Sequence, residues 1–566
     1  MSGATLAPNG RCVYTLRVKY HQARSIAMKN RALWLLAAIA VLFCVSCAER
    51  FSHVALNDFR AVERVVVETS YGPVAGFVDR GVTTFLGMPY AKAPVGELRF
   101  APPQEPERWS HLYPAVAYGP VAHQPPEKTE IASSFFQNEE CLSVNVWTPA
   151  VDAKRRPVIF FIHGGGFIFG GTADPMYNGE EFARRGDVVF VSANYRVGSF
   201  GFLYLDFLGK EFRGTGNNGI LDQIAALKWV KANISRFGGD PNNVTIMGES
   251  AGSISVTMLM ATPAAKGLFH KAIAQSGAPN VMRSRTEAEG YARAFMKIAN
   301  VQDAAGLRKL SAAQMLEVQK KIMELAGLEM DAVFSPVVDG AVIPRPPYEA
   351  IAAGSAAGIP LLSGANKDDF RYWLRFSRAI LLVTPSGFLD RTPTFTKRLG
   401  ADKNKIIDYY KSAYPAQSGG DLSLMMATDM FFWYPHVALS EAQSKNAKTW
   451  LYSFAWPSPA EGGIYGAMHA IELPFVFFQL KSDPFAMGPN PPVEFAKQMN
   501  DTWINFAKNG VPSAPGLPEW PAYEVEKRAT MVLNVKSEVV YDPKRADREQ
   551  LSKLSILTPP PDSAAK

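Results

Sequence analysis

The chain alternates between short apolar runs and longer amphipathic stretches. Residues 157–162, 188–193 and 244–247 are nearly continuous apolar runs of strand length, which is typical of strands buried on both faces of a parallel sheet. Residues 217–237 have apolar positions at helical spacing, and Gly238 follows their end. Strands that alternate with helices predict an α/β fold with a large, mostly parallel, twisted sheet flanked by helices.

The remaining patterns predict the organisation around this sheet. Residues 64–78 alternate and carry a turn at Tyr71–Pro73, which predicts an antiparallel hairpin. The chain has 566 residues, of which 47% are hydrophobic, so it can bury a large core. We expect one catalytic domain over residues 49–566, with a disordered tail after about residue 557.

Net charge does not indicate a nucleic-acid partner. The formal charge is +7 and the pI is about 9.0, but residues 1–48 contribute six basic side chains and no acidic one. The rest of the chain therefore carries only +7 − 6 = +1. No basic binding surface is needed to explain the composition.

The basic N-terminal region has the pattern of a secretory signal peptide. Within residues 28–48, two basic residues precede an apolar run over 32–45, and small residues follow it. We expect export to the periplasm or the medium, with Met28 as an alternative start and Cys47 as a candidate site of lipid attachment. A retained membrane anchor is the alternative. Cys141 is then the only cysteine of the mature body, so that body has no intramolecular disulfide.

Ser250 lies in a G-x-S-x-G motif between an expected strand and an expected helix. Gly248 and Gly252 flank it. A tight strand-to-helix turn forces the serine into a strained conformation, and a β-carbon at either neighbouring position would clash with it. The motif therefore predicts an exposed nucleophile at the start of a helix.

A second glycine-rich turn predicts an oxyanion hole. The sequence HGGGF at residues 163–167 follows the apolar run that ends at residue 162. We expect the amides of Gly165, Gly166 and Ala251 to stabilise a developing oxyanion. A phosphate-binding P-loop is excluded, because no Lys-Ser/Thr follows the glycines. The alternative interpretation is that residues 163–167 form an ordinary glycine-rich turn with no catalytic role.

The histidine that serves as base should follow the nucleophile and the acid along the chain. This order leaves His436 and His469 among the eight histidines. His436 lies in a helical pattern, where a lone histidine is usually structural, so we expect His469 to be the base. The acid should follow a strand between Ser250 and His469, and both Asp368 and Asp369 fit that position.

The chain resembles the type-B carboxylesterase/lipase family, the cholinesterase-like α/β-hydrolases, and within it the bacterial carboxylesterases. The resemblance runs from about Arg64 onward and rests on several stretches together: FLGMPYAKAPVGELRF, EECLSVNVWTP, HGGGF, GESAGS, GANKDD and GAMHAIELPFVF. It implies an α/β-hydrolase fold and a Ser250–Asp369–His469 triad. It also implies a buried ion pair between Arg99 and Glu139.

Three departures from the family pattern qualify the resemblance. Phe370 stands where a glycine usually follows the acid. The stretch before Glu139 lacks the cysteine that often pairs with the one at position 141, and it lacks the aromatic choline-binding stretch of true cholinesterases. The resemblance therefore implies an esterase that is not specific for choline.

These features predict a serine esterase that forms an acyl-enzyme and needs no cofactor or metal. The expected partner is a small-molecule ester with an apolar group, because residues 370–383 and 430–439 are rich in apolar and aromatic residues. Core packing is the alternative interpretation and the favoured one for most of these residues. Glu249 is either an electrostatic helper of the imidazolium or a structurally paired carboxylate. An unperturbed histidine would give an activity midpoint near pH 6.5.

Alternative functions remain open on the sequence alone. An amidase or carbamate hydrolase would use the same acyl-enzyme route. A non-catalytic binding domain would keep the fold without the chemistry. Arg371, Arg375 and Arg378 either hold an anionic substrate group or are solvated at the surface.

Overall fold

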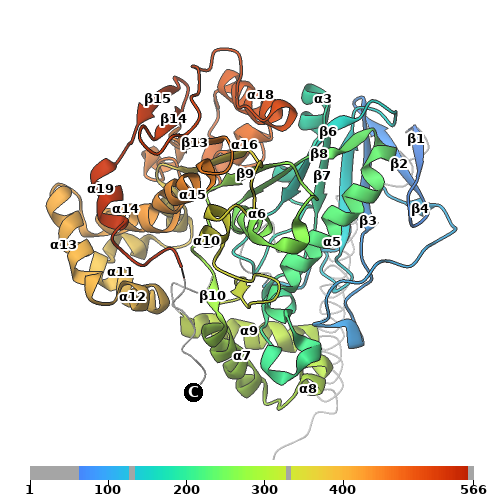
Figure 1. Cartoon of the computed structure of the whole chain (residues 1–566), viewed down its shortest axis with the longest axis horizontal. Coiled ribbons are helices and arrows are strands. Elements are labelled where there is room, and N and C mark those ends of the chain that lie inside the picture. The colour runs from blue at the N-terminus through green and yellow to red at the C-terminus, as the bar shows by residue number, and fades with distance from the viewer. Residues whose placement is uncertain (1–62, 126–133, 327–332, 559–566) are drawn as a thin grey trace, which may run out of the picture. The chain divides into compact units, whose positions relative to one another are not determined.

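A computed structural model describes residues 63–125, 134–326 and 333–558. The presequence expected over residues 1–48 and the end of the expected disordered tail lie outside the described residues. Within the unit that begins at Arg64, the described strands form one large sheet, with a separate two-stranded sheet beside it (Figure 1).

Among the described residues, thirteen strands belong to the large sheet. Its strands are β1 (Arg64–Glu68), β2 (Pro73–Asp79), β3 (Val82–Pro89), β4 (Tyr113–Pro114), β5 (Ser143–Thr148), β6 (Arg156–Ile162), β7 (Val189–Ala193), β8 (Gly239–Glu249), β9 (Lys271–Gln275), β12 (Leu361–Asn366), β13 (Thr449–Phe454), β14 (Ala529–Leu533) and β15 (Glu538–Tyr541). The small sheet pairs β10 (Arg283–Ser284) with β11 (Val337–Val338).

The helices follow or connect these strands. They are α3 (Glu180–Gly186), α4 (Gly198–Phe202), α5 (Asn218–Asn233), α6 (Ala251–Ala261), α7 (Arg285–Ala299), α8 (Ala304–Lys309), α9 (Ala312–Ala326), α10 (Pro347–Ala352), α11 (Pro385–Asp390), α12 (Pro393–Leu399), α13 (Lys403–Ala413), α14 (Gly419–Thr428), α15 (Tyr434–Ser444), α16 (Leu473–Val476), α17 (Pro484–Met487), α18 (Val493–Asn509) and α19 (Arg545–Leu551). Short 3₁₀ helices η10 (Asp369–Arg375) and η11 (Arg378–Leu382) and a π-helix η13 (Asp429–Trp433) complete the cavity region.

The centre of the sheet is parallel and its edges are antiparallel, except that the short β4 pairs with β2 in parallel. The spatial order is β1-β2-β3-β5-β7-β6-β8-β9-β12-β13-β14-β15, with β4 beside β2. The pairs from β7 through β14 are parallel. The predicted hairpin is confirmed as the antiparallel pair β1–β2, and the predicted α/β class with a mostly parallel sheet is confirmed.

The central strands are continuously apolar because helices cover both faces of the sheet. In β6, Phe160 packs with the cluster that contains α5 and α6, whereas Phe161 packs with the cluster that contains α3, α16 and α18. Neighbouring residues of a strand point to opposite faces, so both must be hydrophobic. Figure 1 shows α5 and α6 on the side of the sheet nearer the viewer.

This topology gathers the candidate site at one edge of the sheet. Side chains that follow the carboxyl ends of parallel strands meet at the same edge. Ser250 follows β8, Asp369 comes shortly after β12, and the glycine turn follows β6. His469 lies in the connection after β13. Residues far apart along the chain are therefore delivered to one place by the strand order alone.

The ion pair implied by the family resemblance is present. Arg99 donates from Nε to Glu139 Oε2 over 2.8 Å, and its Nη1 donates to the carbonyl oxygen of Arg308 over 3.0 Å. Both charged side chains are nearly buried, with exposed fractions of 10% and 13%. Arg99 therefore ties the loop after β3 both to the segment before β5 and to α8.

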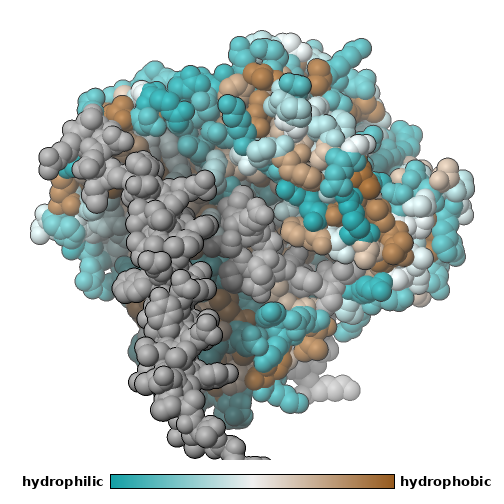
Figure 2. Space-filling model, turned by 180° about the vertical axis from the view of Figure 1, so that it is seen from behind, coloured by the Kyte–Doolittle hydropathy of each residue, from teal (hydrophilic) through white to brown (hydrophobic). Residues whose placement is uncertain are grey.

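The visible described surface is mixed in character. Seen from behind, it is largely hydrophilic, with hydrophobic residues in small groups (Figure 2). Such scattered apolar residues are normal on a folded protein. A search of the described helices finds none with the length and hydropathy needed to cross a bilayer.

Candidate active site

Ser250 occupies a strained turn between β8 and α6. Its φ of 57° and ψ of −125° lie outside the regions that ordinary residues adopt. A β-carbon at Gly248 would lie 2.3 Å from the carbonyl oxygen of Gly252, and one at Gly252 would lie 2.0 Å from that of Ile162. The two glycines are thus required because backbone atoms approach them too closely for any side chain.

The glycine turn after β6 lies against the nucleophile. A β-carbon at Gly164 would lie 3.1 Å from Cβ of Ser250. Gly165 and Gly166 follow with φ values of 108° and 60°, so the backbone turns in a conformation that favours glycine. Among the described residues, the amides of Gly165 and Gly166 donate to no acceptor. They line the same cavity as Ser250 and Ala251.

His469 is held by a buried carboxylate. Its Nδ1 lies 2.7 Å from Oδ1 of Asp369, and its backbone N–H donates to the carbonyl oxygen of Asp369 over 3.2 Å. The other carboxylate oxygen of Asp369 accepts from the amide of Asn366 over 2.8 Å and from the hydroxyl of Ser276 over 3.2 Å. The imidazole therefore has a fixed orientation, with Nε2 directed away from Asp369.

The structure separates the two candidate acids. Asp369 contacts the imidazole, whereas Asp368 accepts from the amide of Ala467 over 3.0 Å. His436, the competing histidine, lies on α15, and its ring nitrogens face Gly277 and Ser363. Its Nε2 accepts from the amide of Gly277 over 2.8 Å, and its Nδ1 lies 2.8 Å from the hydroxyl of Ser363. Burial lowers the pKa of His436 to about 3, which suits a neutral structural role.

Glu249 reaches the other nitrogen of the histidine. Its Oε1 lies 3.1 Å from Nε2 of His469. Burial raises the pKa of Glu249 to about 8, although the nearby imidazole opposes the shift. Burial lowers the pKa of His469, but the charges of Glu249 and Asp369 outweigh it and raise that pKa to about 9. The structure thus raises the pKa of His469 above the unperturbed value near 6.5 that the sequence led us to expect. Because the two groups lie side by side, Glu249 and His469 titrate as a coupled pair.

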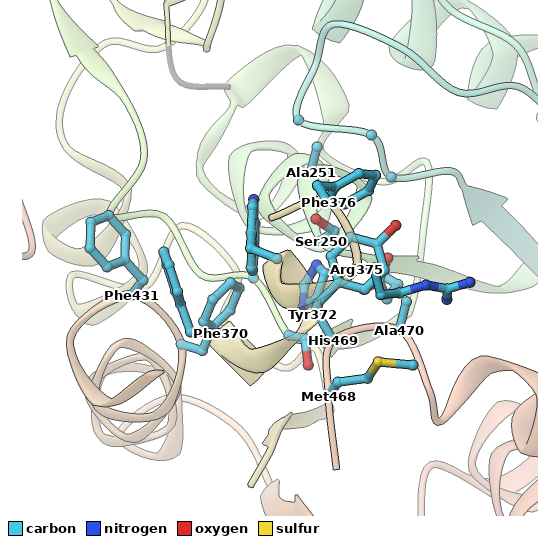
Figure 3. A pocket seen from close by; sticks show the side chains of 18 of the residues that line it. Ser250, Ala251, Phe370, Tyr372, Arg375, Phe376, Phe431, Met468, His469 and Ala470 are labelled. Carbon is cyan, nitrogen blue, oxygen red and sulfur yellow. Dashed lines mark ion pairs between the residues drawn. The ribbon is translucent and has the colours of Figure 1, made fainter. Parts of the chain in front are cut away.

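Three aromatic rings enclose the imidazole. The ring centroids of Tyr372, Trp373 and Phe432 lie 5.9, 5.6 and 4.9 Å from that of His469. Figure 3 shows Tyr372 beside His469, below Ser250. Sequence reasoning assigned these residues only to apolar stretches. Their positions on η10 and on the π-helix η13 bring them to the histidine, and no local pattern in the sequence indicates that contact.

Ser250 and His469 open onto a single large cavity. Its volume is about 1370 Å³, which exceeds the roughly 300–1,000 Å³ of an ordinary small-molecule site. Figure 3 shows Phe370 and Phe431 on one side of Ser250 and His469, and Arg375 on the other. The cavity can therefore hold a substrate with a sizeable group on either side of the reacting bond.

Comparisons with known proteins now decide the family. A model of the carboxylesterase family matches residues 63–552. The chain belongs to the carboxylesterase family. The para-nitrobenzyl esterase of Bacillus subtilis is 38% identical over 497 residues, which cover 86% of this chain and 98% of the relative. The phenmedipham hydrolase of Pseudarthrobacter oxydans is 32% identical and is covered over its full length, together with 87% of this chain.

A solved structure of similar fold agrees. The crystal structure of a Geobacillus stearothermophilus carboxylesterase superposes with a TM-score of 0.78 at 39% identity, covering 86% of this chain and 100% of that one. The expected α/β-hydrolase fold and family are confirmed, and the protein is a carboxylic ester hydrolase.

The three arginines that the sequence singled out are engaged in ion pairs, and Arg375 among them lines the cavity of this carboxylesterase. Arg371 Nη2 lies 2.6 Å from Asp421 Oδ1, and Arg375 Nη1 lies 2.7 Å from Asp483 Oδ2. Arg378 pairs with Glu461. Within the described ranges, no group of three or more histidine, cysteine, aspartate or glutamate side chains is arranged to hold a metal ion.

We predict that Gly252→Ala lowers the free energy of unfolding by about 2 kcal/mol or more, because the new methyl group would meet the carbonyl oxygen of Ile162. Gly290→Ala is the matched control. A β-carbon at Gly290, on the exposed side of α7, meets nothing within 4 Å, so this change should be neutral or stabilising by up to about 1 kcal/mol. Urea unfolding midpoints measure both, and equal stability of the two variants would contradict the close approach.

Proposed function

We propose that this carboxylesterase hydrolyses esters through an acyl-enzyme formed on Ser250, with His469 as general base and Asp369 as the acid of the triad. The observation that carries the proposal is the position of His469. Its imidazole is fixed by Asp369 at one nitrogen and lines the same cavity as the strained serine. Acyl transfer needs this combination of nucleophile, base and orienting carboxylate.

The proposed reaction proceeds in two halves. His469 accepts the proton of Ser250 as the hydroxyl attacks the ester carbonyl. The amides of Gly165, Gly166 and Ala251 stabilise the oxyanion, and each such donor contributes on the order of 100–1000-fold in rate. His469 then protonates the leaving alcohol. Water repeats the sequence on the acyl-enzyme and releases the acid.

Glu249 is proposed to act as an electrostatic partner of the imidazolium. Its carboxylate lies beside Nε2, the nitrogen that must accept the serine proton, and it is buried. A negative charge there stabilises the protonated histidine that forms in each half-reaction. Because one proton can reside on either member of the pair, His469 can remain neutral while Glu249 is protonated.

The proposed substrate is a small-molecule ester that carries an apolar group. Support comes from the phenylalanine and tryptophan side chains of η10 and η13 that line the cavity. Amides and carbamates share the acyl-enzyme route and form the second candidate class, since the relative from Pseudarthrobacter oxydans is named for phenmedipham hydrolysis.

We expect a fluorophosphonate probe to label the wild-type protein and to leave Ser250→Ala unlabelled, because only an activated serine attacks the probe. Mass spectrometry of the labelled peptide identifies the site.

Asp369→Asn should reduce kcat by about 10³-fold or more through loss of the correct tautomer of His469. The adjacent Asp368→Asn is the matched control and should lose less than about tenfold. Labelling of Ser250→Ala, or equal losses of kcat in the two aspartate variants, would contradict the proposal.

We predict that kcat/KM falls as the pH decreases, with a midpoint above 6.5, because activity needs neutral His469 and the folded protein raises the pKa of this histidine to about 9. Glu249→Gln removes the charge that contributes most to raising this pKa. The midpoint should therefore move to lower pH, by roughly 1–2 pH units. Full pH–rate profiles of both proteins measure the change. An unchanged midpoint, or a shift to higher pH, would show that Glu249 does not act on the imidazole.

Export is proposed from the N-terminal sequence pattern. A basic head, an apolar run over residues 32–45 and small residues after it are the features of a signal peptide. Expression of the full chain in a bacterium, followed by fractionation and N-terminal sequencing, should find a shortened protein outside the cytoplasm. An intact N-terminus on cytoplasmic protein would contradict export.

A further inference from the structure

Four phenylalanine rings form a compact group on one side of the cavity. They are Phe370, Phe388, Phe395 and Phe431, here called the phenylalanine box, and all four line the cavity. They come from η10, α11, α12 and the π-helix η13, respectively. Four separate elements thus each contribute one ring to the same part of the cavity. The group is therefore not simply the hydrophobic face of a single helix.

The rings of the box are arranged edge to face and stacked. Phe370 and Phe388 meet at 5.3 Å with an interplanar angle of 84°, and Phe388 meets Phe431 at 6.3 Å and 86°. Phe395 and Phe431 are stacked at 4.5 Å and 27°. Aromatic rings favour these two geometries because their faces are negative and their edges positive. A further ring entering the box would find both faces and edges to contact.

Part of the box is fixed and part is open. Phe388 and Phe395 are only 1% and 4% exposed and belong to the hydrophobic cluster of α11–α14. Phe370 and Phe431 are half-buried and pack against that cluster. The buried pair therefore forms a floor, and the half-buried pair presents its rings to the cavity. Simple core packing would bury all four.

The box is connected to the reacting groups by a further stacked ring. Phe370 stacks on Trp373 at 4.5 Å and 21°, and Trp373 lies 5.6 Å from His469. Arg375 lies on the opposite side of His469 (Figure 3). It is paired with Asp483, so the cavity wall there carries charged groups. The two sides of the cavity thus differ in chemistry: four phenylalanine rings meet one another in the box, whereas the Arg375 side combines an ion pair with the rings of Tyr372 and Phe485.

We propose that the phenylalanine box binds an aromatic ring of the ester substrate, so that the enzyme selects aryl-bearing esters over aliphatic esters of equal size. This inference rests on the proposed esterase function and specifies its substrate class. A saturated ring would gain only the burial of apolar area, whereas an aromatic ring also gains favourable contacts with the faces and edges of the box.

The test uses two pairs of esters that differ only in ring type. Methyl 3-phenylpropanoate and methyl 3-cyclohexylpropanoate place the ring on the acyl side. 2-Phenylethyl acetate and 2-cyclohexylethyl acetate place it on the alcohol side. We expect the wild-type protein to prefer the phenyl ester in at least one pair, by about two- to tenfold in kcat/KM.

Variants at Phe431 locate the source of this preference. Phe431→Leu removes an open ring of the box and should bring the phenyl-to-cyclohexyl ratio close to 1, whereas Phe431→Tyr keeps a ring and should retain the preference. Phe136→Leu is the matched control, because Phe136 is 73% exposed and is not part of the cavity lining. It should leave the ratio at the wild-type value. Circular dichroism melts establish that each variant is folded.

Two outcomes would overturn the inference: no phenyl preference in either pair, or a preference that Phe431→Leu leaves unchanged. Each remains distinct from failure of the esterase proposal. Fluorophosphonate labelling of Ser250 and hydrolysis of methyl butanoate report the esterase chemistry and do not require the box. If Phe431→Leu does not fold, Phe370→Leu removes the other open ring and tests the same ratio.

Discussion

The close approach of two backbone segments at the nucleophile turn sets the rest of the site. Gly252 lies against the carbonyl oxygen of Ile162, the last residue of β6, so the start of α6 is pressed onto the neighbouring strand. This contact brings the glycine turn after β6 next to Ser250. Nucleophile and oxyanion donors are consequently positioned by one backbone contact, and the strain at Ser250 is maintained by the packing around it.

Burial of several acidic groups gives the site its electrostatic character. Glu249, Asp369 and Glu472 are all buried, and burial raises the pKa of each. Asp369 and Glu472 are stabilised by hydrogen bonds from Asn366, and Glu249 lies beside His469. The charges of these three carboxyl groups favour the binding of a proton by a group that lies among them. The imidazole is the group placed to carry it, which explains why this histidine is more basic than an exposed one.

Much of the fold follows from local sequence, because its determinants are local. The apolar runs of β6, β7 and β8 and the glycines around Ser250 act over a few residues. The choice between Asp368 and Asp369 needed the family register, since both follow the same strand. The contact between Glu249 and His469 and the rings around the imidazole join residues far apart along the chain. The π-helix η13 also escaped prediction, since its sequence runs into the helical pattern of α15 without a break.

The phenylalanine box lies in a single continuous stretch of chain between β12 and β13. These two strands are direct neighbours in the sheet, with Asn366 opposite Phe454 at their ends. Because the strands are parallel, the stretch leaves the carboxyl end of β12 and returns to the amino end of β13, where Thr449 lies opposite Leu361. Its length and sequence can vary while the strands stay paired. Recombination of this one stretch between homologous genes would exchange the box together with Asp369 and leave the nucleophile turn intact. Related enzymes can therefore differ in this stretch, and in the substrates they select, while they keep the same nucleophile turn.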